Sequence, residues 1–390
     1  MSQTTTTAAS PLPALLGATM SGRTAPASAA DRAIKRRRVL DILDAREQDS
    51  LLLTTHTALT WYLDGSRVHI SLAGDPIAAV LVDRDSDHLV TFNNEAGRIA
   101  AEELPPGVTL HSIPWYRNLR EAAAAVGRST RTAGSAGTPL GCTPLAEAAV
   151  ATELRAARQQ LLPAESARYA HLSAELAGMM TDVLSAAGPD TTEFELASAL
   201  AGRVVAAGAE PLVLLCNGSS RSGFRHPLAT HAPLGRRAMA VVCARRDGLI
   251  ANITRWVRFD AGTSEELDAE ARIAAVEADI FTATVPGARL DSIFGEIKAA
   301  YVRHGFGGEQ WEQHHQGGPA GYAGRDPRVT ADATDTVVLS QPFTWNPSGP
   351  GVKIEDTVQI TESGLTVLTV DERWPTTSVN GLRRPVTLQV

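Results

Sequence analysis

The chain has 390 residues, of which 44% are hydrophobic and 20% are charged. This balance is typical of an ordinary globular protein and leaves room for two hydrophobic cores. The formal net charge of -7 excludes the overall basic character that binding to nucleic acid or to an anionic membrane would favour. No apolar run approaches the roughly 18 residues that a membrane-spanning helix needs. We therefore expect no nucleic-acid partner and no membrane association.

Cysteine usage and the N-terminal residues bear on the cellular compartment. Cys142, Cys216 and Cys243 are odd in number and widely spaced, which matches neither a disulfide framework nor a CxxC zinc site. The first residues contain no basic region followed by an apolar one, so a secretory signal is not expected. These features indicate a reducing compartment, and we expect a cytoplasmic protein. The one basic cluster, Arg36–Arg38, is expected to be a solvated helix face rather than a docking patch.

The first part of the chain predicts a tail followed by a small α/β domain. Residues 1–30 are rich in Thr, Ala, Ser and Pro without periodicity, so they cannot bury enough apolar surface to order themselves. Strands and helices then alternate, which is typical of an α/β domain, here over residues 31–160. The expected elements are a strand at 51–53, a strand at 77–82, a helix at 95–104 and a strand at 108–113. Residues 127–143 are rich in Gly, Ser and Thr and predict a surface loop near the boundary.

The second part, residues 161–376, predicts an α+β domain in which two groups of strands each have helices beside them. A long helix is expected from Pro163, and Thr192 with Glu195 and Thr263 with Glu266 form capping boxes that open two more. Further elements are expected as strands at 212–215, 238–244, 249–257, 336–340, 352–361 and 365–370, and as a helix at 290–303. Residues 377–390 are expected to form a C-terminal tail.

Two clusters with a possible catalytic or binding role lie between residues 226 and 255. His226 lies in a polar loop before Pro227, where a histidine can act as an acid or a base near neutral pH, although a surface histidine in a turn would look the same. Asn252, Thr254 and Arg255 alternate with apolar residues in a strand, so they form either a site or the wet face of a sheet.

Two further clusters follow. His314 and His315 precede a glycine-rich loop that ends at Arg325, and this loop suits close backbone approach and the binding of a carboxylate or phosphate. Adjacent histidines on a strand point to opposite faces and make a poor pair of metal ligands. Asn346 and Glu355 flank strand-forming residues, so Glu355 either faces a cavity or makes a salt bridge with a neighbour such as Lys353.

Taken in order, these clusters resemble the pita-bread family of methionine aminopeptidase, prolidase, aminopeptidase P and creatinase. His226-Pro227 is similar to the family's histidine loop, and residues 252–255 (Asn-Ile-Thr-Arg) are similar to its Asp-x-Thr-Arg strand. Residues 314–318 fall on its His-rich glycine loop, and Asn346-Pro347 falls on its Glu-Pro. The resemblance covers about residues 163–374, and it implies a C-terminal pita-bread domain with a smaller N-terminal α/β domain.

The same resemblance implies that the dinuclear metal site of the metallopeptidases is lost. Their two Asp, one His and two Glu fall here near Val241–Cys243 and on Asn252, Gly318, Asn346 and Glu355. Two divalent ions need several anionic oxygens to offset their mutual repulsion, and one carboxylate with two amides cannot supply them. We therefore expect no metal and no other cofactor.

Creatinase is the branch of the family that works without metal, and residues 314–326 resemble its pattern. By this resemblance His226 is the acid/base and Arg325 binds a substrate carboxylate, while His314 lines the site with His315, Tyr322 and Asn252. Arg67 would reach across a two-fold homodimer. Creatinase has a Glu at the position of Asn346, so a neutral amide is as suitable a substrate here as a guanidine.

These residues predict a metal-independent hydrolase that cleaves an amide or amidino C–N bond in a small carboxylate-bearing molecule. His226 would take a proton from water, and Glu355 with Asn346 would orient the scissile group. Alternatives are proton transfer, elimination or cyclisation on the same fold, a pseudoenzyme that only binds, and a residual metallo-aminopeptidase or prolidase.

Overall fold

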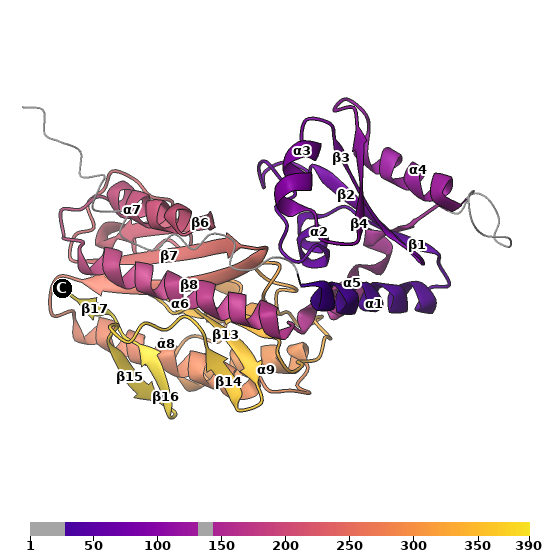
Figure 1. Cartoon of the computed structure of the whole chain (residues 1–390). Coiled ribbons are helices and arrows are strands. Elements are labelled where there is room, and N and C mark those ends of the chain that lie inside the picture. Colours follow the sequence, from indigo (N-terminus) through magenta and orange to yellow (C-terminus); the bar gives the residue numbers. More distant parts are fainter. Residues whose placement is uncertain (1–27, 132–142) are drawn as a thin grey trace, which may run out of the picture.

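The computed structural model describes residues 28–131 and 143–390 (Figure 1). Residues 1–27 of the expected tail and residues 132–142 of the expected loop lie outside the described residues. Ser28 is already the N-cap of the first helix, because its side chain accepts from the Asp31 N–H. In the part of the chain that is described, no helix is long and apolar enough to cross a membrane.

The N-terminal domain is a five-stranded sheet with helices packed against it, as the alternating pattern predicted. Its elements are α1 (Ala29–Ala45), β1 (Ser50–Leu53), α2 (His56–Tyr62), β2 (Ala78–Asp83), β3 (Asp87–Phe92), α3 (Ala96–Arg98), β4 (Val108–Ile113), α4 (Leu119–Arg131), β5 (Leu145–Ala146) and α5 (Ala151–Gln159). The strand order is β4-β3-β2-β1-β5, with parallel pairs at both edges. A π-helical turn, Ile99–Glu103, extends α3. The strand β3 was missed in the sequence because it begins with charged residues, but its Asp87 is buried against Arg32 and Arg36.

The C-terminal domain has two four-stranded sheets, each accompanied by two long helices. Its elements are α6 (Pro163–Ser185), α7 (Glu193–Ala206), β6 (Glu210–Gly218), β7 (Arg237–Arg246), β8 (Leu249–Arg258), α8 (Ser264–Ala283), α9 (Leu290–Arg303), β9 (Gly317–Pro319), β10 (Pro342–Trp345), β11 (Ser348–Gly349), β12 (Val352–Lys353), β13 (Asp356–Thr361), β14 (Gly364–Val367), β15 (Thr376–Val379), β16 (Leu382–Pro385) and β17 (Leu388–Gln389). The sheet orders are β17-β8-β7-β6 and β14-β13-β10-β9. The predicted α+β class and both capping boxes are confirmed.

The two sheets meet where Glu355 pairs with Thr254 of β8. The Thr254 N–H donates to the Glu355 carbonyl at 3.1 Å, and the Asn252 N–H donates to the Thr357 hydroxyl at 2.8 Å. Alternation along β6, β7 and β8 sends one set of side chains into the core under α6 and α7, including Cys216, Val242 and Ile253. The opposite set faces the junction of the two sheets.

Four expected segments differ from the structure, the first being residues 127–131 of the expected loop, which form the end of α4. Residues 336–340 are not a strand, since Thr336 makes one isolated bridge and Ser340 has φ 61°, which a regular strand does not accommodate. The expected strand at 352–361 is divided into β12 and β13, because Glu355 leaves the ladder to bridge Thr254. The expected tail at 377–390 is built into the domain: β17 pairs with β8, and Arg384 is buried between Glu277 and Asp356.

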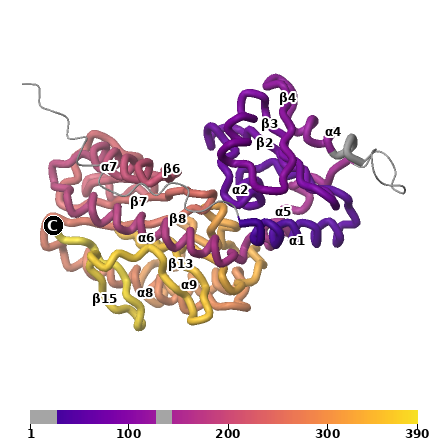
Figure 2. The backbone as a smooth tube through the Cα atoms, in the orientation of Figure 1, coloured from indigo at the N-terminus to yellow at the C-terminus, as the bar shows by residue number. Residues whose placement is uncertain are grey.

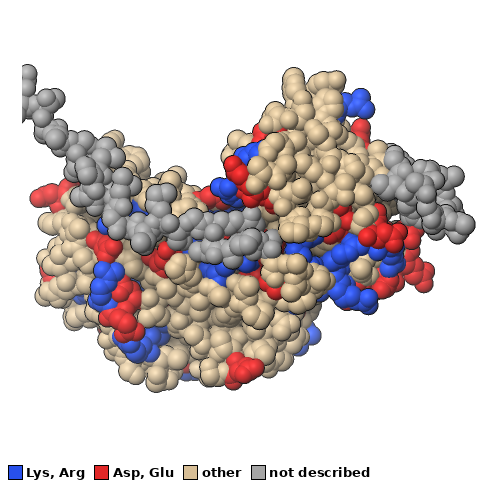
Figure 3. All heavy atoms as spheres, viewed as in Figure 1, with Lys and Arg blue, Asp and Glu red and all other residues tan. Residues whose placement is uncertain are grey.

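The basic cluster also differs from its expected role as a solvated face. Arg36 pairs with Asp87, and Arg38 donates to the Ala157 and Gln160 carbonyls, so these two side chains fasten α1 to its neighbours. Only Arg37 stays mainly in solvent, with a side chain 69% exposed. On the face drawn in Figure 3, basic and acidic side chains lie beside one another where α1 runs in Figure 1.

A buried ionic cluster joins the two domains where α1 lies near α6 (Figure 2). The Lys35 ammonium lies 2.7 Å from both Asp64 and Glu165, and all three side chains are at most 1% exposed. Arg168 donates to Asp64 at 2.8 Å, and the Tyr322 hydroxyl donates to Glu165 at 2.6 Å. The apolar core around it is continuous from the N-terminal domain to β8, so the domains share one interior.

Replacing Lys35 tests this junction. Lys35→Met leaves Glu165 buried without a cation, so we expect a loss of about 3–5 kcal/mol in the free energy of unfolding. Arg37→Ala on the solvent side of the same helix should change it by no more than about 0.5 kcal/mol. Urea unfolding of both variants measures the difference, and equal stabilities would contradict the assignment.

Candidate functional site

An open cavity of about 660 Å³ lies at the junction of the two sheets. Its polar lining consists of His226, Cys243, Asn252, His315, Arg325, Arg328, Asn346, Lys353 and Glu355. Its apolar lining consists of Leu212, Val213, Leu215, Val241 and Ile250, with Gly324 between the two groups. The structure therefore brings most of the site residues predicted from the sequence into one place.

The β6–β7–β8 sheet gives this cavity a polar and an apolar side. Leu215 lies opposite Val241 on β7, which lies opposite Thr254 on β8, and Val213, Cys243 and Asn252 form the neighbouring row. The residues of each row share one face because partners in a ladder point the same way. The cavity wall thus changes from polar on β8 to apolar on β6.

Glu355 holds the polar side together. Its carboxylate accepts from Arg325 at 2.9 Å, from Lys353 at 2.9 Å and from the Thr254 hydroxyl at 2.7 Å. Burial would raise the pKa of this carboxyl, but the Lys353 and Arg325 cations and the hydrogen bonds lower it to about 2. The carboxylate is therefore ionised at neutral pH. The salt bridge with Lys353 weighed as an alternative does form, but it is buried in the cavity.

Three histidines meet beside this carboxylate. The Nε2 atoms of His226 and His314 are 3.0 Å apart, and the His314 and His315 rings stack with centroids 4.4 Å apart. Burial, with the nearby Lys353 cation, lowers the pKa of His314 to about 3, and burial with Arg325 and Arg328 lowers that of His315 to about 4. The pKa of His226 is also lowered, by burial and by Lys353. All three imidazoles are neutral near pH 7, so they can accept protons.

Buried polar contacts position the two histidine loops. Glu193 is fully buried at the start of α7 and accepts from the Gly218 N–H at 2.9 Å and the Thr230 N–H at 2.8 Å, on either side of His226. Gln316 donates to the His314 carbonyl at 2.5 Å and is held in turn by the Tyr301 hydroxyl at 2.8 Å. Sequence reasoning did not single out these anchors, because the contacts join residues far apart in the chain.

The residues present do not fit the two-metal site of the metallopeptidases. Among the described residues that line the cavity, Glu355 is the only carboxylate, and both of its oxygens already bind protein cations. At Gly318, where the resemblance places the metal-binding His, φ is +144° and an added Cβ would lie 2.5 Å from the Pro327 carbonyl oxygen. The backbone of residues 327–329 therefore leaves no space for a side chain there.

A single ion has one candidate group. Within residues 28–131 and 143–390, His226, His314 and His315 are the one set of three metal-capable side chains, with ligand atoms within 4.8 Å of one another. The set has no carboxylate or thiolate, and Lys353 and Arg325 lower the affinity of these nitrogens for a proton. The same positive potential opposes a metal cation, so we assign no metal to it.

Three predicted site residues are placed away from this cavity or at its edge. Tyr322 is buried in the domain junction, where its hydroxyl binds Glu165, and it does not line the cavity. Arg67 is an exposed residue of the N-terminal domain that binds Glu103 at 2.5 Å. His314 contacts His226 and lines a separate small pocket of about 20 Å³. A role for Arg67 across a dimer stays a prediction.

Sequence reasoning missed two cations and a thiol in the cavity. Lys353 was considered only as a salt-bridge partner, and Arg328 was not considered because no motif includes it. Cys243 faces Asn252 across the ladder, and burial, with the Glu355 carboxylate, raises the pKa of its thiol to about 12. That thiol is therefore protonated and unsuited to act as a nucleophile near neutral pH.

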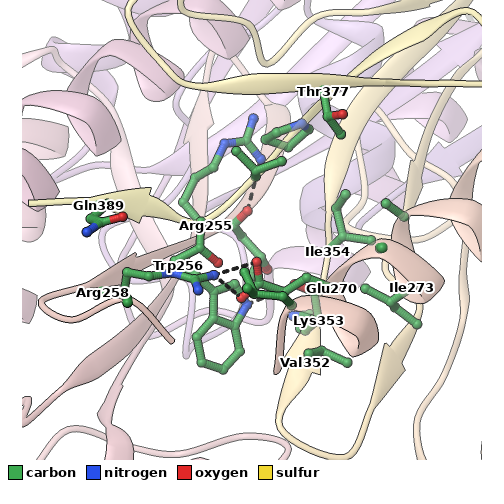
Figure 4. Close-up of a pocket in the computed structure, with 18 residues that line it drawn as sticks. Arg255, Trp256, Arg258, Glu270, Ile273, Val352, Lys353, Ile354, Thr377 and Gln389 are labelled. Carbon is green, nitrogen blue, oxygen red and sulfur yellow. Dashed lines mark hydrogen bonds and ion pairs between the residues drawn. The ribbon is translucent and has the colours of Figure 1, made fainter. Parts of the chain in front are cut away.

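A second cavity of about 520 Å³ lies between β8, α8 and the C-terminal strands (Figure 4). Its charged side chains are paired with protein groups, Arg258 with Glu270 at 2.5 Å and Arg255 with Asp356 at 2.8 Å. In Figure 4 the Arg258 and Glu270 side chains meet inside the pocket, with Ile273 and Ile354 on its wall. No histidine lines it, so the first cavity is the better candidate site.

The fold is that of the pita-bread proteins. The structure is similar to a prolidase from Pyrococcus horikoshii OT3, with a TM-score of 0.70, 16% sequence identity, and coverage of 87% of this chain and 99% of that one. It is also similar to the dipeptidase PepE from Mycobacterium ulcerans, with a TM-score of 0.72, 16% identity, and coverage of 94% and 100%. The predicted C-terminal pita-bread domain with a smaller N-terminal domain is confirmed.

The same fold occurs in a protein of another kind. The N-terminal domain of the FACT complex subunit SPT16 from chickpea matches with a TM-score of 0.64, 13% identity, and coverage of 87% of this chain and 95% of that one. No protein-family model and no curated protein sequence matches the chain. At these identities the likeness shows the fold alone, and the chemistry has to be argued from the site.

Replacing Glu355 tests the electrostatics of the cavity. Glu355→Gln leaves Arg325 and Lys353 buried without a counter-charge, so we expect a loss of about 3–5 kcal/mol in the free energy of unfolding. Because the pKa of Glu355 is about 2 in the folded state and ordinarily 4.5, its stabilisation is complete above pH 4.5 and declines as the pH falls toward 2. Urea unfolding at several pH values should show that the loss on substitution shrinks below pH 4.5. The exposed Glu312→Gln is the matched control, and an equal effect of both would refute the role of Glu355.

Proposed function

We propose that the chain is a metal-independent hydrolase that cleaves the C–N bond of a carboxylate-bearing amide. The observation that carries this proposal is the pairing of Glu355 with Lys353 and Arg325 beside neutral histidines in one cavity. In this proposal the Lys353 and Arg325 cations supply the positive charge that metal ions supply in the metallopeptidases the chain resembles. The similarity to prolidases and dipeptidases supports hydrolysis as the reaction class.

His226 supplies the base. In the tautomer that this role requires, the His226 Nε2–H donates to the His314 Nε2, which leaves Nδ1 of His226 as the nitrogen with a free lone pair. This nitrogen takes a proton from a water molecule as the water oxygen attacks the carbonyl carbon. When the C–N bond breaks, the same proton passes to the leaving nitrogen, so His226 returns to its neutral form.

Lys353 stabilises the charge that develops on the carbonyl oxygen. Its ammonium is fixed by Glu355 at 2.9 Å and lines the cavity, so it is oriented before the substrate binds. Glu355 is ionised and cannot donate a proton, and its part is to position Lys353 and Arg325. Asn346 has a buried side-chain oxygen without a partner, which suits it to accept an N–H from the substrate amide.

His226→Asn tests the base. We expect kcat to fall about 10²–10⁴-fold on any amide that the wild type hydrolyses. In the wild type, kcat/KM should decrease as the pH falls through a midpoint below 6.5, because protonation of His226 removes the base and its pKa is lowered. The Glu355 carboxyl, with a pKa of about 2, stays ionised over that range of pH. Turnover unaffected by the substitution would exclude His226 as the base.

Metal removal distinguishes the proposed metal-independent hydrolase from a metal-dependent prolidase. We expect well under one Mn, Co or Zn ion per purified chain by elemental analysis, and unchanged turnover after dialysis against EDTA. Activity lost on chelation and restored by Mn²⁺, or cleavage of Xaa-Pro dipeptides, would instead support a metallopeptidase.

A binding module is the second candidate, favoured by the occurrence of this fold in the N-terminal domain of SPT16. It predicts ligand binding without turnover of any amide or guanidino acid. Proton-transfer or elimination chemistry would use the same base, and products without oxygen from labelled water would favour it. A two-fold homodimer and a cytoplasmic location remain expectations that gel filtration with light scattering and cell fractionation would test.

A further inference from the structure

We propose that the substrate is an N-acyl amino acid with a long apolar acyl chain, whose carboxylate binds Arg328 and whose chain packs against β6. This inference rests on the proposed function, because it names the substrate class of the same cavity. It differs from the sequence-based expectation in both the size of the substrate and the residue that holds its carboxylate.

Arg325 is already committed to the protein. Its side chain is 8% exposed, its Nη2 donates to Glu355 at 2.9 Å, and its Nη1 donates to the Gly324 carbonyl at 2.5 Å. Its Nε is buried as well, so a substrate carboxylate could form a two-pronged contact with this guanidinium only in exchange for the Glu355 contact. The cost of separating a buried ion pair makes that exchange unfavourable.

Arg328 lines the same cavity from three residues further along the chain, and it is exposed. No hydrogen bond or ion pair holds its guanidinium to any residue within 28–131 or 143–390. It is close enough to His226 and His315 to lower the pKa of both. An unpaired guanidinium at the rim of a cavity offers a two-pronged donor for a carboxylate.

One wall of the same cavity is apolar and partly exposed. Leu212 and Val213 on the edge strand β6 are each 37% exposed, and Leu215 with Val241 continues their surface toward β8. Two inter-strand spacings separate β6 from β8, so this wall extends about 10 Å from the row of Asn252 and Thr254. A ligand of the size of creatine would leave it uncovered, whereas a chain of several methylenes would cover it.

The scissile amide of such a ligand lies between its two ends. The unpartnered Asn346 oxygen accepts the amide N–H, while the Lys353 ammonium and the His226 base act on the carbonyl group. Water supplies the hydroxyl of the released fatty acid, and its other hydrogen goes to the amino acid nitrogen. The cavity volume of about 660 Å³ lies in the range of about 300–1,000 Å³ found for drug-sized ligands.

Calorimetric binding to the full chain tests the inference with three defined probes: N-decanoylglycine, N-acetylglycine and N-decanoylglycinamide. We expect N-decanoylglycine to bind at least about tenfold more tightly than N-acetylglycine, because the decanoyl chain buries methylenes on β6. Arg328→Gln should weaken N-decanoylglycine about tenfold or more and leave the neutral amide unchanged. Val213→Ser should reduce the advantage of the long chain, whereas Val302→Ser, an exposed change on α9, should not.

Each result has a defined consequence. Equal affinities of the two acids, or an Arg328→Gln variant that binds N-decanoylglycine like the wild type, would overturn the inference. Arg325→Gln tests whether Arg325 holds the carboxylate instead of Arg328. We expect this variant to lower the stability of the protein, but not to weaken N-decanoylglycine more than N-decanoylglycinamide. Binding as expected without release of decanoate would refute the proposed hydrolysis and retain the ligand class, so the two failures are distinguishable.

Discussion

The carboxylate of Glu355 is the interaction on which the arrangement of the site depends. The backbone carbonyl of Glu355 links β13 to β8 through the Thr254 N–H. The side chain of Glu355 binds the Thr254 hydroxyl, Lys353 and Arg325. Glu355 therefore helps to join the two sheets and fixes two of the three cations that line the cavity. A single buried charge can do this only because two cations and a hydroxyl offset the cost of its desolvation. Since the carboxylate is saturated by protein donors, chemistry in the cavity must use groups around it rather than its own oxygens.

A second buried cluster ties that site to the N-terminal domain. Tyr322 lies in the glycine-rich loop that ends at Arg325. Its hydroxyl is bound to Glu165, which shares Lys35 with Asp64. The Tyr169 hydroxyl also donates to the Ile250 carbonyl at 2.7 Å, two residues before Asn252. The position of the loop thus depends on contacts from both domains. Tyr322, which the resemblance placed in the substrate pocket, instead makes a structural contact at the domain junction.

Local signals in the sequence were enough for most of the fold. The Pro163 helix start, the capping boxes at Thr192 and Thr263 and the runs that became β7 and β8 are decided by neighbours a few residues away. The site was harder, because pairing is decided in three dimensions. Nothing in the order of residues 314–328 shows that Glu355 takes the guanidinium of Arg325 and leaves that of Arg328 free. The built-in C-terminal strands were missed for the same reason, since Arg384 finds Glu277 more than a hundred residues away.

The charges that line the cavity differ from those of a dinuclear metal centre. A dinuclear centre places four positive charges among carboxylates, whereas here one carboxylate faces the single charges of Lys353 and Arg325. A fixed ammonium can polarise a carbonyl group as a metal ion does, with less charge and without an exchangeable water. In the hydrolase that we propose, the activating base is a side chain. Burial, together with the surrounding cations, lowers the pKa of His314 and His315 and keeps their imidazoles neutral. In the proposed reaction, the single carboxylate, the buried cations and the neutral histidines therefore act together.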